Sequence, residues 1–336
     1  MTDLYYRPIP MTDAAVPDGA FTLAGGWCWF DRAEVLDRRG HRGIIAARDI
    51  PADWLDRLVA PRADFAGVVL DRPRMMGIVN ITPDSFSDGG HFLEPAAALT
   101  RGACMAEQGA SILDLGGEST RPGAPEVPEA EELRRVLPVI AALAAAGVPL
   151  SIDTRKAAVA RAALAEGVRI VNDVSGLDHD PGMAAVVAGS SAFLCLMHMR
   201  GTPQTMQDEA RYDDVLLDVY DALEAKVARA EAAGIPRARI AIDPGIGFAK
   251  TEEHNLAILR RLSLFHGIGC AILLGVSRKR FIGRIGGTLH PEERGPGTTA
   301  LTLAAATQGV QIHRLHVMSE NRQALALWQA VQGARG

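Results

Sequence analysis

The chain has few cysteines and no excess of charge of one sign, and both features exclude classes of protein. The four cysteines are scattered at Cys28, Cys104, Cys195 and Cys270. Without a Cys-x-x-Cys pair, this spacing indicates neither a zinc site nor a disulfide framework, and we expect reduced, mostly buried thiols. The 35 basic and 40 acidic residues give a net charge of -5, so no general attraction to nucleic acid is expected.

Long apolar runs are also absent from the chain. No stretch of about 18 apolar residues occurs anywhere in the sequence. The first residues include Asp3, Arg7 and two early prolines, which differ from the charged start and apolar run of a secretory signal. We therefore expect a cytoplasmic protein that has no membrane as a partner.

The chain has a β/α period over most of its length. From about Arg74 onward, short runs rich in Val, Ile and Leu alternate with longer Ala-rich stretches, as in a parallel sheet with helical crossovers. The predicted strands are 76–81, 112–115, 150–153, 170–173, 192–197, 240–243, 271–276 and 312–317. Predicted helices include 129–145, 156–166, 213–233, 253–264 and 321–331. Eight such units predict a (β/α)8 TIM barrel over residues 73–336, with a doubly wound open sheet as the alternative.

Residues 1–72 lack this period and are punctuated by Pro, Gly and Arg. They contain three of the four tryptophans, Trp27, Trp29 and Trp54. These rings can pack on the barrel or on another subunit. We expect a small stabilising N-terminal extension, whose further role the sequence leaves unknown.

Polar residues stand at the carboxyl ends of all the predicted barrel strands. In chain order they are Asn80, Asp114, Asp153, Asn172, Asp173, His198, Asp243, Ser277, Arg278, Lys279, Arg314 and His316. Any one alone has an ordinary interpretation as a helix cap or turn residue. Together they predict an active site, because barrel enzymes place their chemistry at these strand ends.

Three features indicate the class of substrate. The loops after the first two strands, ITPDSFSDGGHF and GGESTRPGAPEVP, are much longer than a βα turn requires. Arg314 and His316 are two residues apart on a strand, so they face one side and suit a phosphate or pyrophosphate as two cationic donors. Two carboxylates and an amide, at Asp153, Asp243 and Asn172, suit a polar heterocycle that carries several N–H groups.

These motifs resemble the dihydropteroate synthase family along residues 74 to 331. The matching blocks, in the family's order, are MGIVNITPDSFSDGG (76–90), DLGGESTRPGA (114–124), SIDTRK (151–156), VNDVSG (171–176), LMHMRGTPQTMQ (196–207), DPGIGF (243–248), GVSRKRFIG (275–283) and HRLH (313–316). The resemblance implies a TIM-barrel transferase of folate biosynthesis. Such an enzyme condenses 6-hydroxymethyl-7,8-dihydropterin pyrophosphate with p-aminobenzoate to give 7,8-dihydropteroate and pyrophosphate.

The resemblance also implies roles for individual residues of this chain. The pterin site would be Asp153, Asn172, Asp243, Phe248 and Lys279. The p-aminobenzoate site would be Phe86, Thr120, Arg121, Pro122, Ser277 and Lys279. The pyrophosphate site would be Asn80, Arg314 and His316, with Asn80 as the Mg²⁺ ligand and Asp84 as a further candidate in the first loop. The catalytic residues would be Asp153, Lys279, Arg314 and His316. The family further implies sulfonamide sensitivity and a homodimer formed through late helices.

Two positions depart from the family pattern. Val317 follows His316 where the family usually has aspartate, and we expect Ser319 to cap the final helix instead. Arg280 replaces a serine found in many members.

Two other functions remain open: a methyltetrahydrofolate methyltransferase, which would share only the pterin pocket, and a non-catalytic pterin-binding paralogue. The paralogue would be expected to lose Asn80, Thr120, Arg121 or Lys279, and all four are present.

Overall fold

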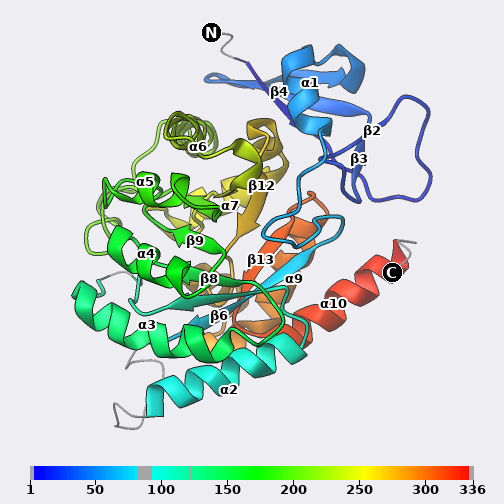
Figure 1. The fold of residues 1–336 in the computed structure, drawn as a ribbon. Coiled ribbons are helices and arrows are strands. Elements are labelled where there is room, and N and C mark those ends of the chain that lie inside the picture. The colour runs from blue at the N-terminus through cyan, green and yellow to red at the C-terminus, as the bar shows by residue number, and fades with distance from the viewer. Residues whose placement is uncertain (1–3, 82–92, 122, 333–336) are drawn as a thin grey trace.

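The computed structural model describes residues 4–81, 93–121 and 123–332, and within them the chain forms a closed eight-stranded parallel barrel (Figure 1). The barrel strands are β6 (Arg74–Asn80), β7 (Ile112–Gly116), β8 (Leu150–Asp153), β9 (Ile170–Asp173), β10 (Phe193–Met197), β11 (Ile240–Asp243), β12 (Ala271–Leu274) and β13 (Ile312–Leu315). β13 pairs with β6 and closes the ring. The predicted TIM barrel is therefore confirmed, and the open sheet is excluded.

The strand register brings polar residues from separate strands to one level of the barrel. β7, β8 and β9 are buried along their whole lengths, as expected for parallel strands covered on both faces. Across four neighbouring strands, Asn80 pairs with Gly116, Gly116 with Asp153, and Asp153 with Asn172. The ends of these strands thus form a continuous row at the carboxyl end of the barrel.

Helices surround the barrel in the expected alternation (Figure 1). They are α2 (Leu93–Glu107), α3 (Glu129–Leu143), α4 (Ala157–Ala165), α5 (Met183–Ala188), α6 (Val215–Ala232), α7 (Glu252–Leu259), α8 (Arg280–Gly286), α9 (Gly295–Ala306) and α10 (Met318–Val331). Short 3-10 helices lie at Ala47–Asp49, Arg237–Arg239, Leu262–Ile268 and Pro291–Arg294. Within the described ranges, none of the helices has the length and apolar character needed to cross a membrane.

Two helix predictions require correction. The predicted helix 253–264 is a shorter α7 followed by the separate 3-10 helix Leu262–Ile268. Ser319 does not cap the last helix, because α10 already begins at Met318 and its N-cap residue, Val317, makes no side-chain cap bond. Ser319 is instead exposed in the first turn. Asn321 donates its side-chain amide N–H to the Val317 carbonyl, 2.9 Å away, and so stabilises the first turn of this helix.

The N-terminal extension forms small sheets of its own. β1 (Tyr5–Pro8), β4 (Arg32–Asp37) and β5 (Gly40–Ala46) make an antiparallel sheet, and β2 (Phe21–Thr22) pairs with β3 (Trp29–Phe30). The short helix α1 (Ala52–Val59) follows.

The extension packs on the barrel of the same chain. Trp54 of α1 stacks on Tyr220 of α6 with ring centroids 5.7 Å apart, and Tyr6 of β1 meets Trp54 edge-on at 5.5 Å. Trp27 donates its indole N–H to the Ala306 carbonyl of α9. Of the two packing partners left open for the tryptophans, the barrel is the one observed for Trp27 and Trp54.

The segment that links the extension to β6 closes the amino end of the barrel. Phe65, Val68 and Leu70 are buried in a cluster with the first residues of the barrel strands, including Ile112 and Ile170. Phe65 also contacts the Phe193 ring at a centroid distance of 5.0 Å. This apolar plug leaves the carboxyl end as the polar end of the barrel.

The stack on α6 predicts that Trp54 makes a large contribution to stability. Trp54→Ala should lower the free energy of unfolding by about 3–5 kcal/mol, because the ring is buried between the extension and α6. Urea unfolding followed by circular dichroism measures this loss. Trp29→Ala is the control, since that ring is partly exposed and should cost less. Equal losses in the two variants would contradict the prediction.

Candidate active site

One guanidinium bridges two buried carboxylates at the centre of the barrel mouth. Arg314, on β13, donates from Nε to Asp114 Oδ2 and from Nη2 to Asp153 Oδ2, both at 2.6 Å. Asn172, on β9, donates its amide to the same Asp114 oxygen at 3.0 Å. Four strands, β7, β8, β9 and β13, therefore meet in one hydrogen-bonded group.

Burial decides the electrostatics of this group. It raises the pKa of Asp153 to about 7, because the desolvation of the carboxylate outweighs the attraction of Arg314, which Asp114 shares. The two carboxylates in turn raise the pKa of Arg314, which stays charged. The second oxygens, Asp114 Oδ1 and Asp153 Oδ1, are buried and have no hydrogen-bond partner among the described residues. Buried acceptors of this kind usually have a partner, so they indicate a place for N–H donors of a ligand.

A second cation lies across the mouth from this group. Lys279 places its Nζ 4.2 Å from the centre of the Phe248 ring, a cation–π contact. Burial lowers the pKa of Lys279 to about 8, while the nearby Asp243 opposes this shift. Burial raises the pKa of Asp243, although one of its oxygens accepts the Gly245 N–H at 2.7 Å.

Two glycines allow the β11–α7 loop to lie this close to its neighbours. Gly245 has a φ of +69°, and a Cβ there would stand 2.0 Å from the His198 carbonyl oxygen. Gly247 has a φ of +83°, and a Cβ would stand 3.1 Å from Cδ of Lys279. The DPGIGF sequence therefore needs glycine at both positions to bring Phe248 beneath the lysine.

Lys250 lies behind Phe248, and the sequence analysis missed it. Its buried Nζ donates to the Phe248 carbonyl at 3.0 Å and lies 2.9 Å from His198 Nδ1. Burial lowers the pKa of Lys250 to about 7. The 2% exposure of His198 and its bond to Lys250 indicate a packed residue behind the site and not a ligand contact. Met197 and Met199 are buried beside it, in the cluster that Phe248 joins.

His316 differs from its predicted charge state. Ser277 Oγ accepts the backbone N–H of His316 at 3.1 Å and lies 2.9 Å from Nδ1 of its ring. When the hydroxyl donates to Nδ1, the neutral ring carries its proton on Nε2. Burial, together with Arg314 and other nearby cations, holds the pKa of His316 well below its ordinary value. The expectation of two cationic donors is therefore wrong for the free protein: Arg314 is charged and His316 is a neutral donor.

The remaining predicted residues lie at the edge of this site or outside the described residues. Asn80 is half-buried at the end of β6, Thr120 is half-buried and Arg121 is exposed in the loop after β7. Within the described parts of the chain, no hydrogen bond joins Thr120 or Arg121 to the carboxylates at the barrel mouth. Asp84, Phe86 and Pro122 lie outside the described residues.

Known proteins are similar to this chain in sequence and in fold. The family model described as "Pterin binding enzyme" matches residues 76–316. The chain is 44% identical over 265 residues to the dihydropteroate synthase of Neisseria meningitidis serogroup C, which covers 78% of this chain and 94% of that protein. The chain belongs to the dihydropteroate synthase family.

Solved structures of the family agree with the barrel. The Xanthomonas albilineans dihydropteroate synthase with 4-aminobenzoic acid superposes with a TM-score of 0.77 at 47% identity, covering 82% of this chain and 99% of that one. A structure of the enzyme from the same organism in complex with 7,8-dihydropteroate gives a TM-score of 0.74 at 44% identity, with coverage of 82% and 100%. The predicted family, fold and enzyme class are thereby confirmed.

The charge pair at the centre leads to a stability prediction. Asp114→Asn should lower the free energy of unfolding by about 1.5–3 kcal/mol, because Arg314 loses a fully buried charged partner. Chemical denaturation at pH 8 measures the loss. Asp71→Asn is the matched control: Asp71 also lies 2.6 Å from an arginine, Arg74, but its side chain is 61% exposed, so little change is expected. Similar losses in both variants would argue against a central role for the Asp114–Arg314 pair.

Proposed function

We propose that this chain catalyses the dihydropteroate synthase reaction at the carboxyl end of its barrel. The chain condenses 6-hydroxymethyl-7,8-dihydropterin pyrophosphate with p-aminobenzoate, as expected of a pterinylmethyl transferase of folate biosynthesis. The observation that carries the proposal is the set of buried acceptors at Asp114, Asp153 and Asp243, placed opposite Lys279 on its aromatic floor. Membership of the family, at over 40% identity across nearly the full length of its relatives, supports the same reaction.

The pterin half of the site is assigned to three strand residues and to two residues that follow β11 and β12. Asp153 and Asp243 accept N–H groups of the pterin, Asn172 offers its amide, Phe248 supplies the aromatic floor and Lys279 donates to the ring acceptors. The two carboxylate oxygens without a described partner support this assignment. So does the 7,8-dihydropteroate complex of the Xanthomonas albilineans relative. A polar ring bound here loses most of its affinity if one buried partner is removed.

The other two parts of the site are assigned to loops and the last strand. The p-aminobenzoate lies against Thr120, Arg121, Ser277 and Lys279, with Phe86 and Pro122 as further members by family resemblance. The pyrophosphate contacts Asn80, Arg314 and His316. The hydrogen-bonded Ser277–His316 pair supports this arrangement, because it leaves Nε2–H of His316 available as a donor.

Mg²⁺ is proposed as the cofactor, with Asn80 as its protein ligand. No group of three or more His, Cys, Asp or Glu side chains that could hold a metal ion occurs among the described residues. A single side-chain oxygen from Asn80 fits Mg²⁺, which binds through one or two protein oxygens while phosphate oxygens and water complete its octahedron. When bound, the ion would offset the charge of the pyrophosphate.

The proposed chemistry is a displacement at the pterin methylene carbon. The neutral aryl amine forms the new C–N bond, the C–O bond breaks, and pyrophosphate leaves with the electron pair while the amine loses a proton. No strong base is required. Arg314 and the N–H of His316 stabilise negative charge on the departing oxygens, and Asp153 stabilises positive charge that develops on the pterin.

Further assignments remain predictions. A homodimer and a cytoplasmic location are expected from the family. A methyltetrahydrofolate methyltransferase or a non-catalytic pterin-binding paralogue would bind the pterin without forming dihydropteroate. Product analysis therefore separates these alternatives from the proposed reaction.

The reaction is tested by pyrophosphate release from the dihydropterin pyrophosphate with Mg²⁺, in the presence and absence of p-aminobenzoate. Release should depend on p-aminobenzoate, and Lys279→Ala should lower kcat/KM by roughly 100-fold or more, because a buried donor to the substrate is lost. Arg280→Ala is the matched control, since this neighbouring cation is exposed, and it should change the rate little. Pterin binding without any dihydropteroate product would refute the proposed activity.

The buried charges also predict the pH dependence of pterin binding. Below about pH 7 Asp153 is protonated and accepts N–H groups poorly, so affinity should rise as the pH rises through this value. Above about pH 8 Lys279 loses its proton and the affinity should fall again. Asp243, whose pKa burial also raises, adds to the acid limb, while Arg314 stays charged throughout.

Calorimetric titration with an unphosphorylated dihydropterin between pH 5.5 and 9.5 measures this profile. In Lys279→Met the affinity should be lower, its acid limb should remain and its alkaline limb should disappear. A constant affinity across the range in the unmodified chain would rule out this electrostatic account.

A further inference from the structure

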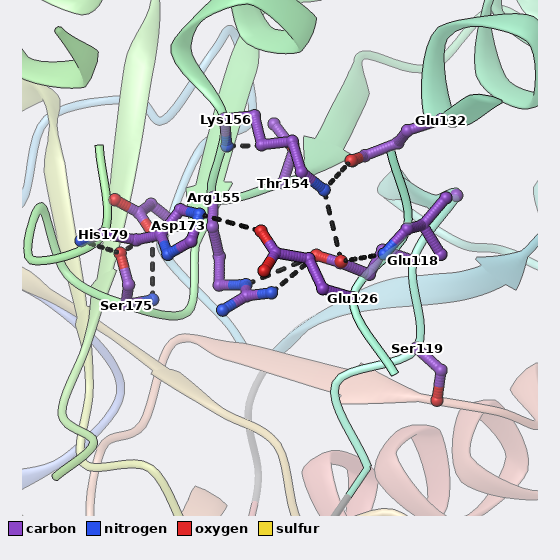
Figure 2. A network of polar contacts seen from close by, with 12 residues as sticks. Glu118, Ser119, Glu126, Glu132, Thr154, Arg155, Lys156, Asp173, Ser175 and His179 are labelled. Carbon is purple, nitrogen blue, oxygen red and sulfur yellow. Dashed lines mark hydrogen bonds and ion pairs between the residues drawn. The ribbon is translucent and has the colours of Figure 1, made fainter. Parts of the chain in front are cut away.

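A buried network of two acids and two bases lies at the root of the loop that follows β7. Glu118 begins this loop, Arg155 and Lys156 follow β8, and Glu132 lies on α3. Figure 2 shows the side chains of Glu118, Arg155 and Lys156 pointing toward one another. The exposed fractions of the side chains are 2% for Glu118 and 0% for Glu132, so the charges are almost completely removed from water.

The four side chains form a row of ion pairs. Arg155 Nη2 lies 2.9 Å from Glu118 Oε2, and Lys156 Nζ lies 3.2 Å from Glu118 Oε1. Lys156 Nζ also lies 2.6 Å from Glu132 Oε2. Burial alone would raise the pKa of Glu118, but hydrogen bonds from Val127 and Arg155 and the two cations outweigh it and keep the pKa below its ordinary value. The carboxylate is therefore charged at neutral pH.

The same carboxylate closes the loop on itself. Glu118 Oε1 accepts the backbone N–H of Val127 at 2.8 Å, nine residues further on. One side chain thus holds both the start and the end of the segment. Among the described residues between these points, Gly123 donates to the Pro203 carbonyl, and Glu126 lies 3.5 Å from His179.

The network connects this loop to the central carboxylates. Arg155 comes two residues after Asp153, which binds Arg314. Gly116, two residues before Glu118, pairs in register with Asp153. The position of Glu118 therefore sets where Thr120 and Arg121 stand relative to the strand that carries Asp153.

We propose that Glu118 is a positioning residue for p-aminobenzoate, which acts by anchoring both ends of the 118–127 loop to the residues that follow β8. This inference rests on the proposed function for the roles of Thr120 and Arg121, whereas the anchoring itself does not. A buried ion network is often no more stabilising than an apolar cluster of the same shape. Its value here is geometric, because one carboxylate binds Arg155, Lys156 and the Val127 N–H at the same time and so joins both ends of the loop to the residues after β8.

The test compares Glu118→Gln with Glu34→Gln. Glutamine keeps the size of the side chain and an oxygen for Val127 but removes the charge that holds Arg155 and Lys156. Glu34 is the matched control: its side chain is 7% exposed and it pairs with Arg7 at 2.6 Å and Arg261 at 3.2 Å, in the N-terminal extension. Both variants lose one buried carboxylate charge, and only one of them touches the loop.

Two readouts separate positioning from stability. In Glu118→Gln, hydrogen exchange of unliganded protein should become faster in peptides that cover residues 118–127. The KM for p-aminobenzoate should rise about tenfold, which corresponds to ~1.4 kcal/mol, while the KM for the pterin pyrophosphate changes less than about twofold. Glu34→Gln should lower the Tm without either effect.

Other outcomes are equally informative. Unchanged exchange in the loop, or equal rises in both KM values, would overturn the proposal. If the unmodified chain forms no dihydropteroate, the proposed function fails, and the exchange experiment still decides whether Glu118 anchors the loop. If Glu118→Gln does not fold, Arg155→Lys, which keeps the charge but loses the second donor of the fork, should give smaller changes in the same direction.

Discussion

The site depends on one buried cation that two carboxylates share. Arg314 contacts Asp114 and Asp153 from the strand that closes the barrel, so the three side chains join β13 to β7 and β8. A single guanidinium cannot fully neutralise two carboxylates in a desolvated interior. Burial, with the neighbouring negative charge of Asp114 added to it, raises the pKa of Asp153 to about 7, and one oxygen of each carboxylate has no partner among the described residues. The same pair that holds the barrel mouth together therefore prepares it for a ligand rich in N–H groups.

Most of the fold could be predicted from the sequence, because its strands are short runs of buried apolar residues that end in polar ones. β8 and β9, for example, have the bounds expected of them. The extension could not be predicted in the same way, since its strands are antiparallel without a β/α period and its aromatic residues pack against α6 and α9. The start of the last helix was also predicted incorrectly, because Ser319 was expected to cap it and the N-cap residue is Val317. There Asn321 stabilises the turn from within the helix, a contact that local sequence preference does not show.

The candidate site was predicted as a set of strand ends, but the partners within it were not. Asp114 was predicted only as one of the polar residues at strand ends, because nothing in the sequence shows which carboxylates Arg314 contacts 200 residues away. Lys250 was missed since it follows DPGIGF by two residues and its role depends on the loop turning back at Gly245 and Gly247. The charge of His316 depends on burial and on the cations around it, which only the assembled barrel determines.

The two halves of the site are held in different ways, and this has a functional consequence. In the proposed assignment, the pterin half combines the strand residues Asp153, Asn172 and Asp243 with Phe248 and Lys279 from the loops after β11 and β12. A change at a strand residue alters the barrel itself. The proposed p-aminobenzoate half includes Thr120 and Arg121, on a loop that Glu118 joins to Arg155 and Lys156 after β8. A change within the loop can then alter the fit of the second substrate while the ion network and the central carboxylates stay in place. On these assignments, a change within the loop alters selectivity for the aryl amine separately from pterin binding, whereas a change at Lys279, which belongs to both halves, alters the two together.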